Sequence, residues 1–105
     1  MAVLSIKKDD FKKEVLDYKG VVSVDFYADW CGPCKIMGPI VDELSDKLKN
    51  IKFVKVNVDE NPDLSSEYSI FSIPTLLVFK EGKMINQLVG VLGKDQLLKT
   101  LTTLP

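Results

Sequence analysis

The sequence predicts an α/β domain built around a mixed β-sheet. Short apolar, β-branched segments alternate with segments of helical periodicity over the first part of the chain, which is typical of parallel strands joined by helices. Glu81-Gly82 separates two later apolar segments, and this pattern indicates a β-hairpin that would make the sheet mixed. A chain of 105 residues is long enough for one hydrophobic core and too short for two, so a single domain over residues 1–105 is expected.

The first two elements are a short strand, Val3 to Ile6, and a helix. Asp9 or Asp10 can cap this helix, which is expected to run to about Tyr18. Gly20 stands just past its end, where glycine commonly terminates a helix. The inner side of the helix is predicted to carry four apolar residues, Phe11, Val15, Leu16 and Tyr18.

Val21 to Tyr27 is predicted to be a buried strand, because it is nearly continuous in apolar and β-branched residues. A helix then begins at or near Cys31, with Pro39 inside it, where we expect a kink or a restart of the helix. Apolar residues recur at helical spacing along it: Ile36, Met37, Ile40, Val41, Leu44 and Leu48.

The remaining elements alternate in the same way. In order they are a strand at Ile51 to Val58, a short helical turn from Asn61-Pro62 to about Tyr68, the hairpin strands Thr75 to Lys80 and Met84 to Val91, and a helix from Lys94 or Asp95. The last helix carries its leucines on one face: Leu97, Leu98 and Leu101.

The segment Trp30-Cys31-Gly32-Pro33-Cys34 contains both cysteines and lies where a strand passes into a helix. Pro33 suits the first helical turn, and cysteines three apart on that turn share a face, with Cα atoms roughly 5 Å apart, as a disulfide requires. Cys31 would sit at the helix N-terminus, where unpaired N–H groups and the macrodipole lower a thiol pKa. Cys34, one turn inside, is the natural resolving thiol.

Two other uses of the cysteine pair are weaker. A zinc site needs four ligands, and the sequence has no second cysteine pair and no histidine, so zinc would require two chains or added carboxylates. A purely structural disulfide would close a very short loop and restrain the unfolded chain least. Redox chemistry is therefore favoured, with a metal-bridged dimer and a binding module with incidental redox chemistry as alternatives.

The composition excludes several classes of function. The net charge is −1 without an acidic or basic block, so neither nucleic acid nor a membrane is an expected partner. The absence of histidine excludes Ser–His and Cys–His nucleophile systems, and no Gly-rich phosphate loop is present. Met1 to Ile6 is too short for a signal sequence and no segment approaches transmembrane length, so a cytoplasmic location is expected.

Several further residues have two interpretations each. Asp25 is either a buried carboxylate that accepts a thiol proton or an edge residue that meets solvent or a lysine. Lys55 either pairs with Asp25 or is solvated. Gly90 marks either a close backbone approach or a bulge. Trp30 is either a packing residue or, as its place beside the cysteines favours, part of an apolar docking surface.

Together these residues resemble the thioredoxin family, in its small, single-domain, bacterial-like form. The resemblance runs from the first helix to the end of the chain and rests on Val24 to Lys35, Val56-Asn57-Val58-Asp59, Ile73-Pro74-Thr75 and Gly90-Val91. It implies a three-layer α/β/α thioredoxin fold, with a central five-stranded mixed sheet flanked by four helices. Thioredoxin is itself the standard example of the lowered thiol pKa invoked above. The Gly32-Pro33 pair matches the reducing branch of the family.

The resemblance implies a general protein-disulfide reductase, an electron-transport protein of cell redox homeostasis. Cys31 would attack a substrate disulfide and Cys34 would resolve the mixed disulfide, which leaves the redox-active disulfide Cys31–Cys34. No cofactor or metal would be bound, and electrons would come from NADPH through a thioredoxin reductase. The expected partners are that reductase and oxidised proteins with accessible disulfides, and the expected state is a monomer.

The resemblance also assigns roles around the cysteines. Asp25 would assist proton transfer at Cys34, with Lys55 as its neighbour, and the Ile73-Pro74 bond would be cis and face the cysteines. A docking surface would bind extended substrate segments through backbone hydrogen bonds, and would consist of Trp30, Gly32, Pro33, Ile73, Pro74, Gly90 and Val91.

Two positions depart from the family pattern. Tyr27 stands where tryptophan is common, so Trp30 is the only indole and its fluorescence should report on the disulfide alone. Phe71 is bulkier and more apolar than the commoner residues at its position, and we expect it to affect the range of substrates.

Overall fold

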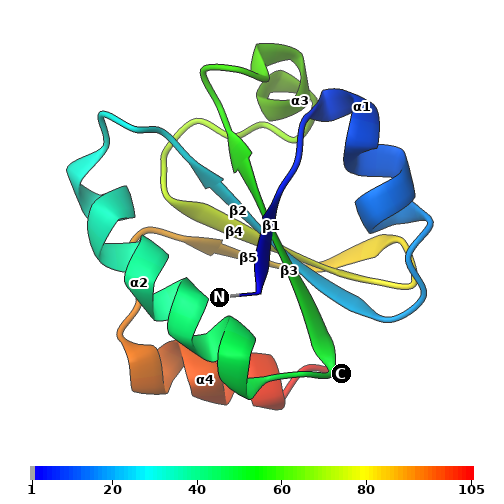
Figure 1. The fold of residues 1–105 in the computed structure, drawn as a ribbon, viewed down its shortest axis with the longest axis vertical. Helices are drawn as coiled ribbons and strands as arrows, with labels where there is room; N and C mark the ends of the chain where they lie inside the picture. The colour runs from blue at the N-terminus through cyan, green and yellow to red at the C-terminus, as the bar shows by residue number, and fades with distance from the viewer. Residues whose placement is uncertain (1) are drawn as a thin grey trace.

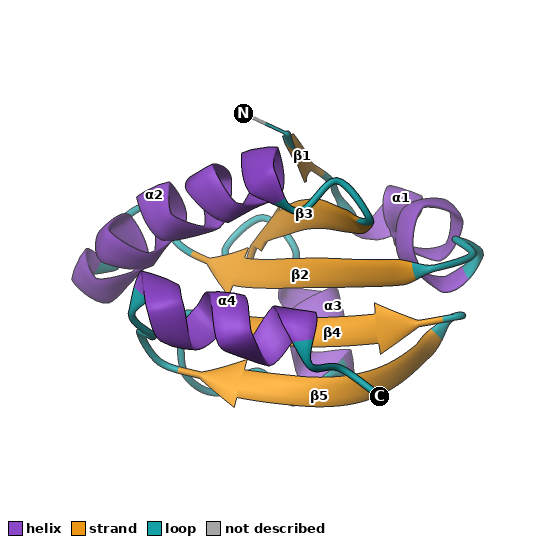
Figure 2. Cartoon of the chain, turned by 90° about the horizontal axis from the view of Figure 1, so that it is seen from below, coloured by secondary structure: helices purple, strands orange, loops and turns teal. Residues whose placement is uncertain are grey.

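Five strands form one mixed sheet with helices on both faces, in a computed structural model that describes residues 2–105 (Figure 1). The elements are β1 (Val3–Ser5), α1 (Lys8–Phe11), the π-helix η1 (Lys12–Leu16), β2 (Val21–Tyr27), α2 (Gly32–Lys47), β3 (Ile51–Asn57), α3 (Pro62–Glu67), β4 (Thr75–Lys80), β5 (Lys83–Val89) and α4 (Lys94–Thr102). Helices α2 and α4 cover one face, and α1 and α3 lie on the other (Figure 2). The predicted three-layer α/β/α arrangement is confirmed.

The sheet has the strand order β1-β3-β2-β4-β5. Strand β3 pairs in parallel with both β1 and β2, whereas β4 pairs antiparallel with β2 and with β5. Strand β2 is therefore central, and its carboxyl end opens towards α2. The predicted mixed sheet is confirmed.

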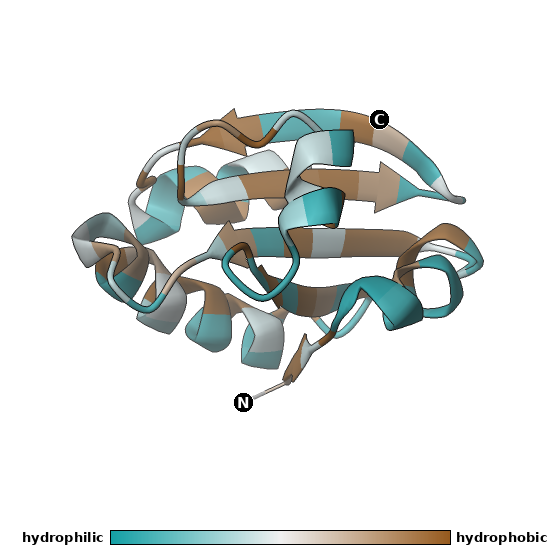
Figure 3. Ribbon diagram, turned by 90° about the horizontal axis from the view of Figure 1, so that it is seen from above, coloured by the Kyte–Doolittle hydropathy of each residue, from teal (hydrophilic) through white to brown (hydrophobic). Residues whose placement is uncertain are grey.

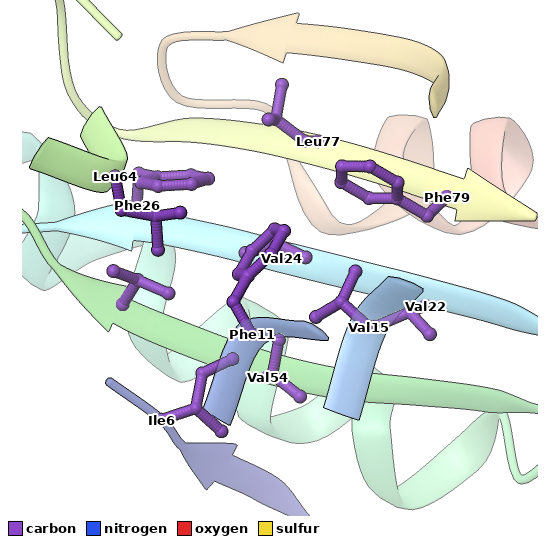
Figure 4. Packing of buried hydrophobic residues seen from close by; sticks show 11 residues of the cluster. Ile6, Phe11, Val15, Val22, Val24, Phe26, Val54, Leu64, Leu77 and Phe79 are labelled. Carbon is purple, nitrogen blue, oxygen red and sulfur yellow. The ribbon is translucent and has the colours of Figure 1, made fainter. Parts of the chain in front are cut away.

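Each face of the sheet carries its own hydrophobic cluster. Alternate residues of β2 point to opposite faces, and Val22, Val24 and Phe26 point towards α1 and α3 (Figure 4). That cluster consists of Ile6, Phe11, Val15, Val22, Val24, Phe26, Val54, Val56, Leu64, Leu77 and Phe79. The cluster under α2 and α4 consists of Met37, Val41, Leu44, Ile51, Phe53, Leu76, Val78, Leu97 and Leu101. Hydrophobic residues accordingly dominate the three inner strands (Figure 3).

The first helix differs from its prediction. Neither Asp9 nor Asp10 is its N-cap residue; Lys7 is, and Asp10 Oδ2 accepts a hydrogen bond from the Lys7 N–H at 3.2 Å. The helix begins earlier than expected because the side chain of its third residue reaches back to the cap. After α1 the chain continues as η1, closed by a 2.7 Å hydrogen bond from the Asp17 N–H to the Lys12 carbonyl. Tyr18 lies beyond the helix and is 38 % exposed, so its inward placement was wrong.

The other elements match their predictions to within one or two residues. Pro39 lies inside one continuous helix α2, so a restart of the helix is wrong, while the kink stays a prediction. Glu81 and Gly82 turn the hairpin with φ of 53° and 78°, the left-handed backbone of a tight hairpin turn. Strand β5 ends at Val89, because Gly90 follows with a φ of 90°.

Candidate active site

The cysteine pair lies at the junction that the sequence predicted. Strand β2 ends at Tyr27, and Cys31 is the N-cap residue of α2, with Pro33 in the first turn. Cys31 Sγ accepts a hydrogen bond from the Cys34 N–H over 3.1 Å. A sulfur therefore takes the place that a hydroxyl or carboxylate oxygen usually holds at a helix N-cap.

Cys31 and Cys34 form a disulfide, with Cα atoms 5.2 Å apart. Both residues are buried and pack with Ala28 against the partly buried side chains of Tyr27 and Ile73. The first turn of α2 thus holds the two cysteines at the separation that a disulfide bond requires. The pair has the geometry of a disulfide that opens and closes on a preformed backbone.

The loop before β4 faces the cysteine pair. The Ile73–Pro74 bond is cis, as predicted, and the Ile73 carbonyl oxygen lies 3.8 Å from Cys31 Sγ. The Pro74 carbonyl accepts a hydrogen bond from the Gly90 N–H at 2.8 Å, which ties this loop to the end of β5. That N–H is therefore occupied within the chain.

Of the two interpretations of Gly90, the bulge is wrong, and a close backbone approach by a substrate stays a prediction. The irregular pairing in the hairpin lies at Val78 and Phe79, so Gly90 is not a bulge. Among residues 2–105, apart from its two chain neighbours, no heavy atom lies within 4 Å of the place where a Cβ would stand, so no contact there requires glycine. The requirement is the φ of 90°, which other residues rarely adopt.

Trp30 is held on the surface rather than packed in the core. Its side chain is 70 % exposed, and its Nε1–H donates a hydrogen bond of 2.7 Å to Asp59 Oδ2. The Asp59 N–H is in turn bonded to Asn57 Oδ1 at 2.9 Å. Asp59 was missed as a site residue, because its contact with Trp30 depends on the pairing of β2 with β3, which the sequence does not determine.

Asp25 is buried, so of its two interpretations the buried carboxylate is confirmed and the edge residue is wrong. It lies in the central strand β2, on the face that α2 covers, and is 5 % exposed. The pKa of Asp25 is raised to about 7, chiefly because the carboxyl is buried. The positive charge of Lys55 lowers this pKa by a smaller amount, and the negative charge of Asp42 raises it further. Within residues 2–105 its Oδ1 has no hydrogen-bond partner. A carboxyl of this kind exchanges a proton near neutral pH.

Lys55 is the neighbour of Asp25 that the sequence suggested. The two residues are directly paired in the parallel register of β2 and β3. Their side chains form no ion pair in the described part of the chain, and Lys55 Nζ lies 5.6 Å from the centre of the Tyr27 ring. Because no direct bond joins the two side chains, the half-buried Lys55 acts on Asp25 through its charge.

The residues assigned to the docking surface differ in exposure. Gly32, Pro33 and Val91 are exposed, as Trp30 is, whereas Pro74 is buried. Phe71 is 90 % exposed on the loop that carries Ile73 and Pro74. Exposed apolar side chains thus precede and follow the buried disulfide and its facing loop along the chain.

Two further features of the described residues bear on function. No helix in residues 2–105 has the length and apolar character needed to cross a membrane. The same residues contain no cluster of three or more histidine, cysteine or acidic side chains arranged to hold a metal ion.

Comparison with known proteins gives a consistent result. The thioredoxin family model matches residues 2–103. Thioredoxin 1 of Nostoc sp. strain PCC 7120 is 48 % identical over 101 residues, which is 95 % of this chain and 94 % of the relative. The thioredoxin of Rickettsia felis is 48 % identical over 95 residues, 90 % of each chain. The thioredoxin of Pyropia yezoensis is 43 % identical over 102 residues, 96 % of this chain and 95 % of the relative.

Proposed function

The chain belongs to the thioredoxin family, and from this membership we propose that it is a general reductase of protein disulfides in which Cys31 attacks and Cys34 resolves. It is a thiol–disulfide oxidoreductase with the Cys31–Cys34 disulfide at its centre. One observation supports the attacking role of Cys31 and the resolving role of Cys34: Cys31 is the N-cap residue of α2, and the Cys34 amide donates a hydrogen bond to its sulfur.

In the first step the Cys31 thiolate attacks one sulfur of a substrate disulfide. A new S–S bond forms between Cys31 and the substrate, and the other substrate sulfur leaves as a thiolate that takes up a proton. The helix N-terminus and the Cys34 N–H both favour the negative charge on Cys31 before the attack.

In the second step Cys34 must lose a proton before it can attack Cys31 Sγ. Asp25, on the buried face below α2, supports a role as proton acceptor because burial raises its pKa to about 7. Attack by Cys34 breaks the mixed disulfide and releases the second substrate thiol. Two electrons and two protons have then passed from the cysteine pair to the substrate, and Lys55 limits how far the Asp25 pKa rises.

The substrate segment would dock in extended form over the docking surface. The exposed indole of Trp30 and the exposed Val91 support apolar contacts there, and the Ile73 backbone supports main-chain hydrogen bonds. The partners proposed are oxidised proteins with accessible disulfides. The oxidised pair would be reduced again by a thioredoxin reductase with electrons from NADPH, without a cofactor bound to this chain, and the working form would be a cytoplasmic monomer.

The test is reduction of insulin disulfides driven by dithiothreitol and followed by turbidity. The wild-type protein is expected to accelerate precipitation, and Cys31→Ser to abolish the acceleration. Cys34→Ser is expected to accumulate a mixed disulfide, visible by mass spectrometry. A wild-type protein that adds nothing to dithiothreitol alone would refute the proposal and favour a binding module.

A further inference from the structure

Two buried side-chain oxygens in the described chain have no hydrogen-bond partner, Ser23 Oγ and Asp25 Oδ1. Their residues are 1 % and 5 % exposed. Both belong to β2 and stand two residues apart, so they point to the same face, below α2. Because a buried hydroxyl or carboxylate without a partner is costly, native proteins nearly always pair such groups.

Four side chains stand directly next to Ser23 on its face of the sheet. Across the strands Ser23 lies between Phe53 of β3 and Val78 of β4, both buried and apolar. On its own strand the same-face neighbours of Ser23 are Val21 and Asp25. Three of the four adjacent side chains are therefore apolar, and the fourth is the Asp25 carboxylate.

We infer that Ser23 is a positioning residue for Asp25, its O–H donating a hydrogen bond to the carboxylate either directly or through one shared water molecule. Neighbours on one face of a strand start roughly 6.6 Å apart. A direct bond needs both side chains to turn towards each other, whereas a bridging water adds two bonds of about 2.8 Å and spans the gap readily. This role rests on the proposed function, in which Asp25 accepts a proton.

The consequence is electrostatic. A donor that binds the charged form of a carboxyl favours that form and lowers its pKa. The charged groups that face Asp25 are Lys55 from β3, which lowers its pKa, and Asp42 from α2, which raises it, while its neighbour Leu76 on β4 carries no charge. Ser23 would oppose the effect of burial without adding a charge.

The test compares Ser23→Val with Ser23→Thr, because valine and threonine have the same shape and differ by one hydroxyl. The pKa of Asp25 is read in the oxidised protein, from its carboxyl carbon by NMR. We expect the Asp25 pKa to rise by about one pH unit in Ser23→Val and to stay within a few tenths of wild type in Ser23→Thr. An unchanged pKa in Ser23→Val, or equal shifts in both variants, would refute the role of the hydroxyl.

Branched side chains between Phe53 and Val78 can prevent folding, so Ser23→Ala provides a second route. It is expected to raise the Asp25 pKa by a similar amount, while Ser65→Ala, a buried serine of α3 whose hydroxyl bonds to the Asn61 carbonyl, should leave it unchanged. No shift in Ser23→Ala would contradict the inference.

A high-resolution crystal structure of the wild type separates the two routes. A water peak between the two oxygens supports the bridged bond, and an Oγ–Oδ1 distance below about 3.2 Å supports the direct bond. A structure that shows neither the water peak nor the short distance would refute the inference. None of these measurements requires catalytic turnover. A negative result for Ser23 can therefore be told apart from a negative result in the insulin assay, which tests the proposed function.

Discussion

The indole of Trp30 is bonded to a side chain from a different strand, because its Nε1–H donates to Asp59 Oδ2 at 2.7 Å. Trp30 follows β2 and Asp59 follows β3, and these strands are parallel neighbours. Most of the ring is exposed, and this bond ties it to the segment that follows β3.

Asp59→Ala is expected to weaken substrate docking without stopping the chemistry. Loss of a hydrogen bond worth about 1 kcal/mol corresponds to a roughly fivefold higher KM for insulin, with kcat little changed. The fluorescence anisotropy of Trp30, the only indole, should fall at the same time as the ring becomes mobile. Glu60→Ala removes the same charge one residue away and is the control; an equal rise in KM there would assign the effect to charge.

Asp25→Asn is expected to make the oxidised protein more stable above neutral pH. The pKa of Asp25 is about 7 in the folded state and 3.8 in its ordinary state. Between these values the unfolded chain releases a proton that the folded chain keeps, so stability falls as pH rises from about 4 to about 7. The full loss is roughly 4 kcal/mol, at 1.36 kcal/mol per pKa unit. Between pH 5 and pH 8 urea unfolding should show about 2.6 kcal/mol of this decline in the wild type and none of it in Asp25→Asn; parallel declines would contradict it.

Phe71→Lys is expected to change substrate preference. The ring is 90 % exposed on the loop that carries Ile73 and Pro74, so it would stand beside a segment docked as proposed above. We expect kcat/KM to fall severalfold for peptide disulfides flanked by apolar residues and to rise for those flanked by acidic residues. Met84→Lys, an exposed position at the hairpin end of β5, should change neither value. Equal changes in both variants would indicate a net-charge effect.

Gly82→Ala is expected to destabilise the protein by about 2 kcal/mol or more. Gly82 has a φ of 78°, and a Cβ there would lie 2.5 Å from the Leu16 carbonyl oxygen. Gly38→Ala is the matched substitution inside α2, where the added methyl meets no heavy atom of residues 2–105 within 4 Å other than its chain neighbours and the backbone of its own helix. It should stabilise the helix by up to about 1 kcal/mol. Urea midpoints give both values, and similar midpoints for the two variants would contradict this account of the hairpin.

Local signals in the sequence predicted most of the fold. The apolar run of β2 and the Glu81-Gly82 turn are each decided by residues close together in the chain, so their bounds agree closely with the structure. The cysteine pair was equally predictable, since the strand before it and the helix after it both have clear periodicity.

The first helix was less predictable because distant residues shape it. Lys52 Nζ bonds to the Glu14 carbonyl at 2.8 Å and to Glu14 Oε1 at 2.7 Å, and the Lys52 ammonium lies 4.6 Å from the centre of the Tyr18 ring. Gly82 packs against the Leu16 carbonyl from the hairpin. These partners lie far from the helix in sequence, and hydrophobic periodicity carries no information about them.

The two interpretations of Asp25 could be decided only by strand order. An apolar strand with one carboxylate fits an edge as well as a centre, and the sequence does not determine which strands flank β2. Placement between β3 and β4 buries Asp25 and brings Lys55 beside it. Asp59 was missed for the same reason, because its contact with Trp30 depends on two strand ends meeting.

The bond from the Cys34 amide to Cys31 Sγ places two tasks on one residue. Its thiol resolves the mixed disulfide, and its amide faces the sulfur that carries the negative charge before Cys31 attacks a substrate. Every side-chain substitution at Cys34 except proline keeps that amide, so a mutational scan of the site would report on the resolving attack and not on the stabilisation of the Cys31 thiolate. Only a change to the backbone, such as replacement of that amide by an ester, would measure the second contribution of Cys34.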